Sequence, residues 1–348
     1  MKTLPPEADL LRRFERLFAT RRRDVKVGVG DDAAVLAAPA SLAVSTDALV
    51  EGEDFTSTTD PYLVGRKALN VNLSDLAAMG ATPLHALLTL GLPRETPLAW
   101  LDGFLDGFRS AAREQTVAVV GGDLSASVQR FASVTVLGRV PAPGPLRRGG
   151  GRPGDELWVS GTLGAAAAGL ALVLCGYRRD RDGKVTAPRG SRVSPARRDE
   201  IARLLRHLLD PRPMVDLGRA LAETGISSAA IDLSDGLARD LHRLCRASGA
   251  GASVEKDLLP VDSGLANLPG HYATRRLQGD LYALTLAVWS QSEPEDAVIL
   301  VSGNRYPLFR YYYDREWVQP WRRQSFEYPA GHGPSWSARP PVVESAAV

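Results

Sequence analysis

The sequence has few cysteines and no long apolar run. Its two cysteines, Cys175 and Cys245, lack both the spacing of a zinc site and the number needed for a disulfide framework, which indicates reduced thiols in a cytoplasmic protein. No window approaches the roughly 18 apolar residues of a membrane-spanning helix. The first residues also lack the apolar core of a signal peptide. We therefore expect a soluble cytoplasmic protein with no membrane partner.

The sequence also has little excess of either charge. The net charge is only +2, and five of the 42 basic residues are lysines. No basic stripe is interleaved with stacking aromatics in the first two thirds of the chain, which argues against a nucleic-acid partner. With 348 residues, of which 44% are apolar, the chain is long enough for two domains with separate cores.

Acidic residues, in contrast, follow predicted strands at four separated places. The stretches are Gly30-Asp31-Asp32, Ser45-Thr46-Asp47, Gly121-Gly122-Asp123 and Asp232-Leu233-Ser234-Asp235-Gly236. Any one of them is typical of an Asx turn or a helix cap. Carboxylates that converge in a fold repel one another unless a cation lies between them, and Mg²⁺ prefers such oxygen ligands. Their recurrence favours a site for Mg²⁺ and a polyphosphate.

A long helix is predicted over residues 60–79. Asp60-Pro61 is a cap followed by proline at the first helical position, and Gly80 ends the apolar stripe. Asn72 and Asp75 lie three residues apart and share one face. Because burying them without partners is costly, they are either bound to a ligand or exposed. A second amphipathic helix is predicted over residues 98–114.

The second half begins after a linker rich in proline, glycine and arginine at residues 141–154, where we place the domain boundary. Residues 177–198 are polar and basic and are expected to form an exposed loop. The acidic stretch at 232–236 lies between a predicted strand and a helix at 237–248, a place where a metal and a phosphate could meet.

Six segments together resemble the thiamine-monophosphate kinase family, whose superfamily includes aminoimidazole ribonucleotide synthetase. They occur in the family's order and spacing: GVGDDAAVL, STDALVEG, ALNVNLSDLAAMGATP, VGGDLS, LRRGGGRPGDELWVSGTLG and AIDLSDGLARDL. The resemblance implies a two-domain α+β fold, with an N-terminal dimerising sheet-plus-helices domain and a C-terminal α/β sandwich domain. The corresponding boundaries are 1–142 for the ATP- and Mg-binding domain, 150–305 for the second domain and 306–348 for a divergent tail.

The resemblance also implies a homodimer that binds ATP and thiamine monophosphate and transfers the γ-phosphoryl group to give the diphosphate. The positions that match the family's Mg²⁺ ligands are Asp31, Ser45, Thr46, Asp47, Asp75, Asp123, Asp232 and Asp235. The positions that match its nucleotide contacts are Gly122, Asp123, Arg148 and Ser234. Metal ions that neutralise the transferring phosphate would account for many carboxylates without an obvious general base.

The sequence departs from the family at the acceptor-binding positions. Asp54 stands where the family usually has histidine, and Asp280 is the nearest match to an acid that meets the thiamine moiety. The C-terminal end that is typical of the family is not recognisable in this sequence. A frameshift, a replaced terminus or divergence would each produce such a difference. Two alternatives follow: a related ATP-using enzyme of the superfamily that acts on another small acceptor, and a non-catalytic dimeric homologue.

Overall fold

The computed structural model describes residues 4–29, 34–37, 41–254 and 258–264, together with the backbone of short strands at 286–289 and 326–327. The first half holds a four-stranded sheet in the order β3-β6-β4-β5. Its strands are β3 (Leu42–Val50), β4 (Thr82–Leu92), β5 (Ala118–Ala126) and β6 (Phe131–Arg139). The pair β4 and β5 is parallel because a helix connects them, whereas β6 runs antiparallel to both of its neighbours.

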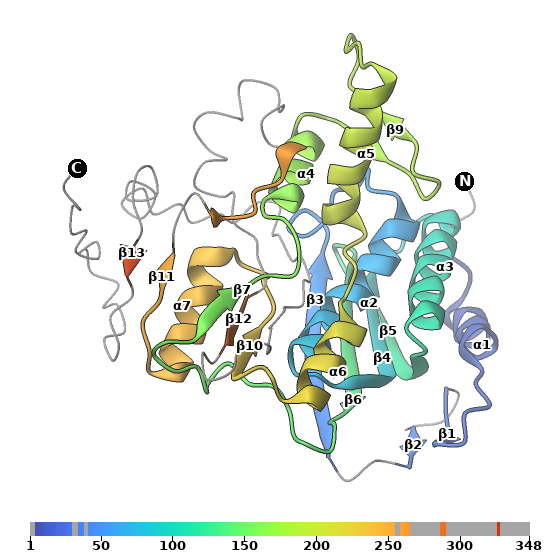
Figure 1. Ribbon diagram of the computed structural model, residues 1–348. Coiled ribbons are helices and arrows are strands. Elements are labelled where there is room, and N and C mark those ends of the chain that lie inside the picture. Colours follow the sequence, from blue (N-terminus) through green and yellow to red (C-terminus); the bar gives the residue numbers. More distant parts are fainter. Residues whose placement is uncertain are drawn as a thin grey trace.

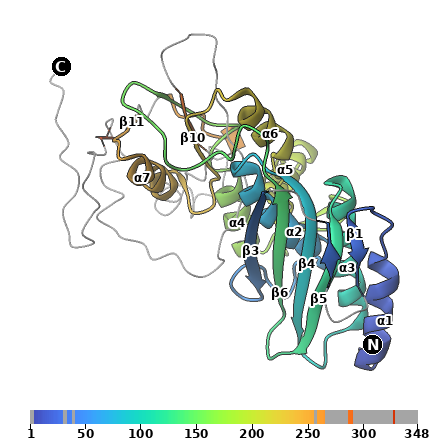
Figure 2. The ribbon, with the colours of Figure 1, turned by 90° about the horizontal axis from the view of Figure 1, so that it is seen from below.

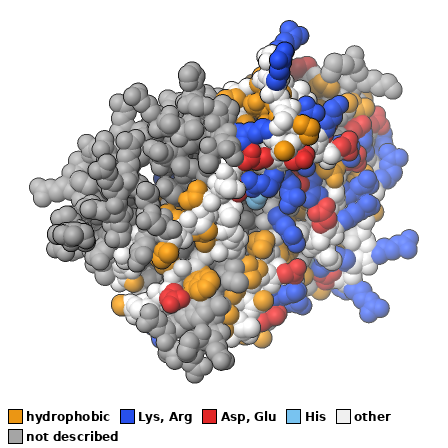
Figure 3. Space-filling model, turned by 45° about the horizontal axis from the view of Figure 1, so that its top comes forward, with side chains coloured by type: hydrophobic (Ala, Val, Ile, Leu, Met, Phe, Trp, Pro, Cys, Tyr) orange, Lys and Arg blue, Asp and Glu red, His pale blue; other side chains and the backbone are white. Residues whose placement is uncertain are grey.

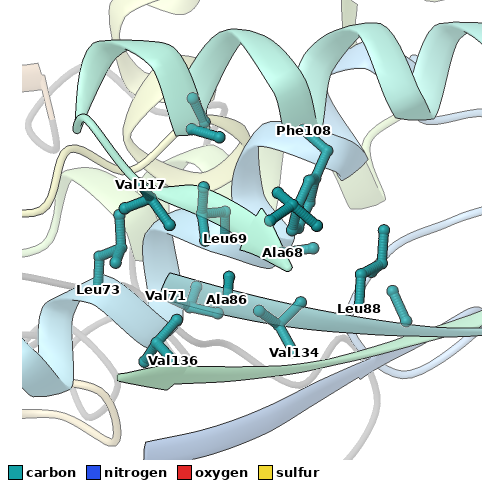
Figure 4. Packing of buried hydrophobic residues seen from close by; sticks show 14 of the residues in the cluster. Ala68, Leu69, Val71, Leu73, Ala86, Leu88, Phe108, Val117, Val134 and Val136 are labelled. Atoms are coloured by element: carbon teal, nitrogen blue, oxygen red, sulfur yellow. The ribbon is translucent and has the colours of Figure 1, made fainter. Parts of the chain in front are cut away.

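Two helices, α2 (Pro61–Ala78) and α3 (Leu98–Glu114), cover one face of this sheet (Figures 1 and 2). Figure 4 shows side chains of α2 and α3 meeting those of β4 and β6 in the largest core. The helix α1 (Glu7–Phe18) lies beside β5. Two short strands, β1 (Val25–Val27) and β2 (Val35–Leu36), form a separate antiparallel pair.

The helix α2 forms as its sequence predicts. Asp60 accepts a bond from the Tyr62 amide at 2.9 Å, Pro61 occupies the first turn, and Gly80 adopts a positive φ of 67° just after the end. Most of its residues are buried, because α3 and the sheet cover two sides and elements of the second half cover a third. The predicted helices at 60–79 and 98–114 are thus confirmed to within one residue at each end.

The second half contains an antiparallel sheet in the order β10-β12-β7. Its elements up to α7 are β7 (Glu156–Trp158), α4 (Ala165–Leu174), β8 (Arg178–Arg179), β9 (Val185–Thr186), α5 (Pro195–Leu209), α6 (Val215–Thr224), β10 (Ala229–Ile231) and α7 (Leu237–Ser248). The other strands are β11 (Ser253–Val254), β12 (Leu286–Trp289) and β13 (Phe326–Glu327), and β11 pairs with β13. One core lies between α4 and α5, and another lies around β10 and α7.

The expectation of an exposed loop at 177–198 holds for residues 187–194 and is wrong for the rest. Residues 178–186 form the β8–β9 hairpin, and α5 begins at Pro195. The hairpin packs on the start of α2, where the Arg181 guanidinium lies 4.3 Å from the centre of the Tyr62 ring and the Arg181 amide bonds to Asp60 at 2.8 Å. The sequence did not indicate that Tyr177 and Val185 are buried, because each is isolated among polar residues.

On the face shown in Figure 3, lysine and arginine side chains lie among aspartate and glutamate side chains. None of the helices in the part of the chain that the structure describes is both long and apolar enough to cross a bilayer.

Candidate functional site: carboxylates at the junction of the two halves

The C-terminal part of α2 carries Asp75 to the place where the two halves meet. Ser45 on β3 donates a hydrogen bond from its Oγ to Asp75 Oδ2 at 2.6 Å. Ser45 and Asp75 were both predicted as metal-binding positions, and the fold brings them together although they lie thirty residues apart. Asn72 and Asp75 lie on one helix as expected, but of the two only Asp75 is partly exposed. Asn72 is 1% exposed and its Nδ2 bonds to the Ala68 carbonyl, whereas Asp75 is only half-buried.

Asp232 reaches the same place from the second half. It follows β10 directly and is 5% exposed, and its Oδ2 accepts a hydrogen bond from Ser74 Oγ at 3.0 Å. Burial, reinforced by the charges of Asp75 and Asp240, raises the pKa of Asp232 to about 8. A carboxyl group in this position is destabilised when it is ionised, so a cation beside it and Asp75 would stabilise both groups.

The turn after Asp232 is held by Asp240, a residue that is fully buried in the first turn of α7. Asp240 Oδ2 accepts bonds from the backbone amides of Ser234 and Asp235 at 3.0 and 2.9 Å. Arg243 donates to Asp240 at 2.7 Å and pairs with Asp235 at 2.6 Å. Burial raises the pKa of Asp240 to about 6, although the Asp235 amide and Arg243 oppose that rise. The predicted strand–turn–helix at this site is confirmed.

Arg148 lies in the segment that joins the two halves. The residue is exposed, and its charge is among the effects that lower the pKa of Asp232. The segment is not a free linker. The Leu146 amide bonds to the Met79 carbonyl at 3.1 Å, and the Ala230 amide bonds to the Arg147 carbonyl at 2.7 Å.

Two of the acidic stretches were expected to lie at strand ends, and this expectation is wrong. Ser45, Thr46 and Asp47 lie within β3, which continues to Val50 because it pairs with β6 along its whole length. Side chains alternate along a strand, so Ser45 and Asp47 face α2 while Thr46 faces the open side of the sheet. There the Thr135 hydroxyl donates to Thr46 Oγ1 at 3.0 Å.

Gly121, Gly122 and Asp123 likewise lie inside β5, after a bulge at Val120. A Cβ at Gly122 would lie 1.8 Å from the Leu88 carbonyl oxygen, so only glycine fits there. Asp123 is exposed and accepts a bond from Ser125 Oγ at 2.8 Å. These residues border a cavity of about 850 Å³ that Phe14 and Phe18 of α1 also line.

Asp123 is separated from the carboxylates of the junction. The strands β3 and β5 form opposite edges of the sheet, so Asp47 and Asp123 lie about 14 Å apart across three strand spacings. Within the described residues, no group of three or more His, Cys, Asp or Glu side chains has the arrangement of a metal site. The oxygen groups of the junction form two hydrogen-bonded pairs, Ser45 with Asp75 and Ser74 with Asp232, and such hard donors suit Mg²⁺.

Of the two predicted acceptor-binding positions, Asp54 and Asp280, the structure describes only Asp54. Asp54 Oδ2 accepts a bond from the Val50 amide at 2.8 Å within the turn after β3. Lys67, which is 1% exposed, donates from Nζ to the Asp54 carbonyl at 3.0 Å. Asp31 and Asp280 lie outside the described residues.

Sequence reasoning missed Ser74 and Asp240, the residues that hold Asp232 and its turn. Ser74 directly precedes a predicted ligand inside a helix, and Asp240 is an acid in the first turn of α7, a place where acids are common for helix stability alone. Their polar character was visible, but their partners are set by the tertiary fold.

Comparison with known proteins identifies the family. Residues 30–140 match the AIR synthase related protein, N-terminal domain, and residues 152–303 match the AIR synthase related protein, C-terminal domain. The chain therefore belongs to the AIR synthase related family, with its two-domain α+β fold. Its sequence relatives place it in the thiamine-monophosphate kinase branch of that family.

The thiamine-monophosphate kinase of Salmonella typhimurium is 39% identical over 261 residues, which are 74% of each chain. The Escherichia coli enzyme of the same name is 37% identical over 262 residues, or 75% of this chain and 74% of that one. The crystal structure of the Stenotrophomonas maltophilia kinase has a TM-score of 0.66 at 35% identity and covers 81% of this chain and 84% of its own. AaThiL complexed with AMPPCP and TMP has a TM-score of 0.62 at 25% identity, covering 88% and 95%.

Proposed function

We infer that this chain is an enzyme that transfers a phosphoryl group from ATP to thiamine monophosphate, giving thiamine diphosphate. The relatives that share 37–39% of its residues bear that name, and a related structure binds AMPPCP and TMP. The observation in this chain that carries the inference is that Asp75 of the first half and Asp232 of the second each bind a serine hydroxyl of the first half, with the charge of Asp75 acting on Asp232. The alternative acceptor and the non-catalytic homologue rest on the changes at Asp54 and Asp280 and on the altered C-terminal end, and no described contact adds support to either.

We further propose that the carboxylates hold Mg²⁺. The proposed ligands are Asp31, Ser45, Thr46, Asp47, Asp75, Asp123, Asp232 and Asp235. Bound Mg²⁺ would supply positive charge against the transferring phosphate. The chain's own part is to keep the ligands in place: Ser45 orients Asp75, Ser74 holds Asp232, and Asp240 fixes the turn that carries Asp235.

Nucleotide binding is assigned to Gly122, Asp123, Arg148 and Ser234. Gly122 lets the backbone of β5 run close to β4, and Arg148 offers an exposed guanidinium whose charge acts on Asp232. The Ser234 amide is held by Asp240, so the turn is rigid before a ligand arrives. Asp54 and Asp280 are proposed as the positions that meet the acceptor.

A homodimer is proposed from the open face of the first sheet. Val44 on β3 is 62% exposed, and Leu87 and Leu137 on the same face are partly exposed, whereas the opposite face is covered by α2 and α3. A second copy packed on this face would remove these apolar side chains from water.

We also propose the domain boundaries 1–142, 150–305 and 306–348. A cytoplasmic location is a further proposal. The described segment around 141–150 has no regular secondary structure, which supports a boundary there, and both cysteines are free thiols.

The function is tested by direct assay. The purified chain is incubated with ATP and thiamine monophosphate, with Mg²⁺ or with excess chelator, and thiamine diphosphate is quantified by chromatography. We expect product only with Mg²⁺. Absence of product with both substrates and Mg²⁺ would refute the proposed activity, and equal product in chelator would refute the metal assignment.

A further inference from the structure

Each half of the chain contributes a carboxylate to the junction. Ser74 of the first half forms a hydrogen bond to Asp232 of the second half. Ser74 and Asp75 are consecutive on α2, so the helix that presents Asp75 also presents the hydroxyl that binds Asp232 at 3.0 Å. Ser74 has no exposed surface and Asp232 is 5% exposed, so water does not compete for this bond.

The framework around this contact leaves little freedom. A Cβ at Gly218 of α6 would lie 1.9 Å from the Ala77 carbonyl oxygen, and a Cβ at Gly80 would lie 2.3 Å from the Ala222 Cβ. The end of α2 therefore lies directly against α6. Because the packing fixes the backbone at Ser74, the direction of its hydroxyl is fixed as well.

We propose that Ser74 is a positioning residue that fixes the Asp232 carboxylate relative to Asp75, and so sets the spacing of the metal-binding oxygens that the two halves contribute. The inference rests on the proposed function, since it presumes that both carboxylates bind a metal. Without the Ser74 hydroxyl, Asp232 loses its hydrogen bond to α2, so its side chain can adopt other rotamers and no longer has a fixed position relative to Asp75. Residues that hold metal ligands in this way affect metal affinity without touching the metal.

The experiment measures metal binding directly. Mn²⁺, a spectroscopic substitute for Mg²⁺, is titrated into the full chain with AMPPCP present, and free Mn²⁺ is counted by electron paramagnetic resonance. Ser74→Ala is expected to weaken Mn²⁺ binding about tenfold. The same variant should need more Mg²⁺ for half-maximal turnover, with kcat largely restored when Mg²⁺ is saturating.

Three further variants separate positioning from a structural role. Ser110→Ala removes a hydroxyl on α3 that bonds to Arg66 of α2 and to Glu114, and it should leave Mn²⁺ affinity unchanged. Ser74→Thr keeps the hydroxyl and should retain Mn²⁺ affinity even if its extra methyl group lowers the melting temperature. Ser74→Cys, a weaker donor of similar size, should behave like Ser74→Ala and replaces it if the alanine variant does not fold.

A double-mutant cycle tests whether Ser74 acts through Asp232. In an Asp232→Asn background, Ser74→Ala should cause no further loss of Mn²⁺ affinity. The inference would be overturned if both Ser74→Ala and Ser74→Cys bound Mn²⁺ as tightly as the wild type. It would also be overturned if the losses of Mn²⁺ affinity in the double-mutant cycle were additive. If the wild-type chain binds Mn²⁺ and makes thiamine diphosphate, such a result refutes only the role of Ser74. If the wild-type chain does neither, the proposed function itself fails.

Discussion

At the scale of single residues, the junction places like charges close together in a buried setting. Asp75 is one reason why the pKa of Asp232 is raised, and each of the two carboxylates accepts a hydrogen bond from a serine hydroxyl. Such an arrangement lowers the stability of the metal-free chain. The residues therefore make opposite contributions to stability and to the proposed activity.

Replacing Asp75 with asparagine is expected to show this opposition. The amide can still accept the bond from Ser45, but the repulsion of Asp232 disappears, so the metal-free chain should gain about 1 kcal/mol in unfolding free energy. Turnover should fall by more than about a hundredfold, since a charged ligand is lost. Urea unfolding in chelator and the diphosphate assay measure the two effects. Activity close to that of the wild type would contradict the assignment of Asp75.

Asp262 gives a prediction about acid stability away from the junction. Burial raises the pKa of Asp262, but bonds from Arg203, the Gly264 amide and Thr162 outweigh burial and lower it to about 2. Because the folded-state pKa lies below the ordinary value, this stabilisation is present above about pH 4 and is lost as the pH falls towards 2. Arg203 is partly exposed, so we expect about 1–2 kcal/mol at neutral pH.

The measurement is urea unfolding of the wild type and Asp262→Asn between pH 2.5 and pH 7. The difference in unfolding free energy should shrink in acid. Asp216→Asn is the matched control, because Asp216 pairs with Arg219 but its side chain is 90% exposed, and its difference should be small throughout. A constant difference for Asp262→Asn would show that its charge does not contribute.

At the scale of elements, glycines decide how closely the helices approach. A Cβ at Gly65 of α2 would lie 2.0 Å from the Phe104 carbonyl oxygen, and one at Gly107 of α3 would lie 1.9 Å from the Tyr62 carbonyl oxygen. The two helices therefore cross with their backbones nearly in contact. Phe104 and Phe108 then stack along the crossing.

Gly65→Ala should consequently force the two helices apart. We expect a loss of about 1–3 kcal/mol in unfolding free energy, although alanine is the better helix former. Gly28→Ala is a suitable control, because a Cβ there would meet only Val25 Cγ1 at an ordinary 3.5 Å. Thermal unfolding of both variants checks the prediction, and a Gly65→Ala chain as stable as the wild type would show that the crossing can relax.

The sequence predicted helices better than strands, for a physical reason. The helix at 60–79 carries its own start and stop signals in Asp60, Pro61 and Gly80. The lengths of β3 and β5 are instead set by pairing with strands that are remote in sequence, so acidic residues expected at strand ends lie inside strands. For the same reason, motifs predicted that Ser45, Asp75 and Asp232 belong to one site, but not that Asp123 lies at the opposite edge of the sheet.

At the scale of the whole molecule, the open sheet face predicts the oligomeric state. Val44→Glu would place a charge in the proposed dimer contact and should weaken dimerisation at least tenfold, with a corresponding loss of activity at low protein concentration. Val128→Glu is the control, because Val128 is 94% exposed beyond the end of β5. Light scattering after size exclusion measures the mass. A wild-type monomer, or a Val44→Glu dimer as tight as the wild type, would contradict the proposed interface.

The close packing of α2 against α6 has a consequence for how the protein is made. The neighbours of Gly80 at the end of α2 include Ala222 of α6 and Leu146, both of which lie later in the chain. At ordinary rates of synthesis, α6 leaves the ribosome on the order of ten seconds after α2. During that interval the first half can complete its sheet and its contact with α3, while the side of α2 that carries Ser74 still faces solvent. The nascent chain thus exposes Ser74, Asp75 and the rest of its share of the proposed metal site until the second half covers them.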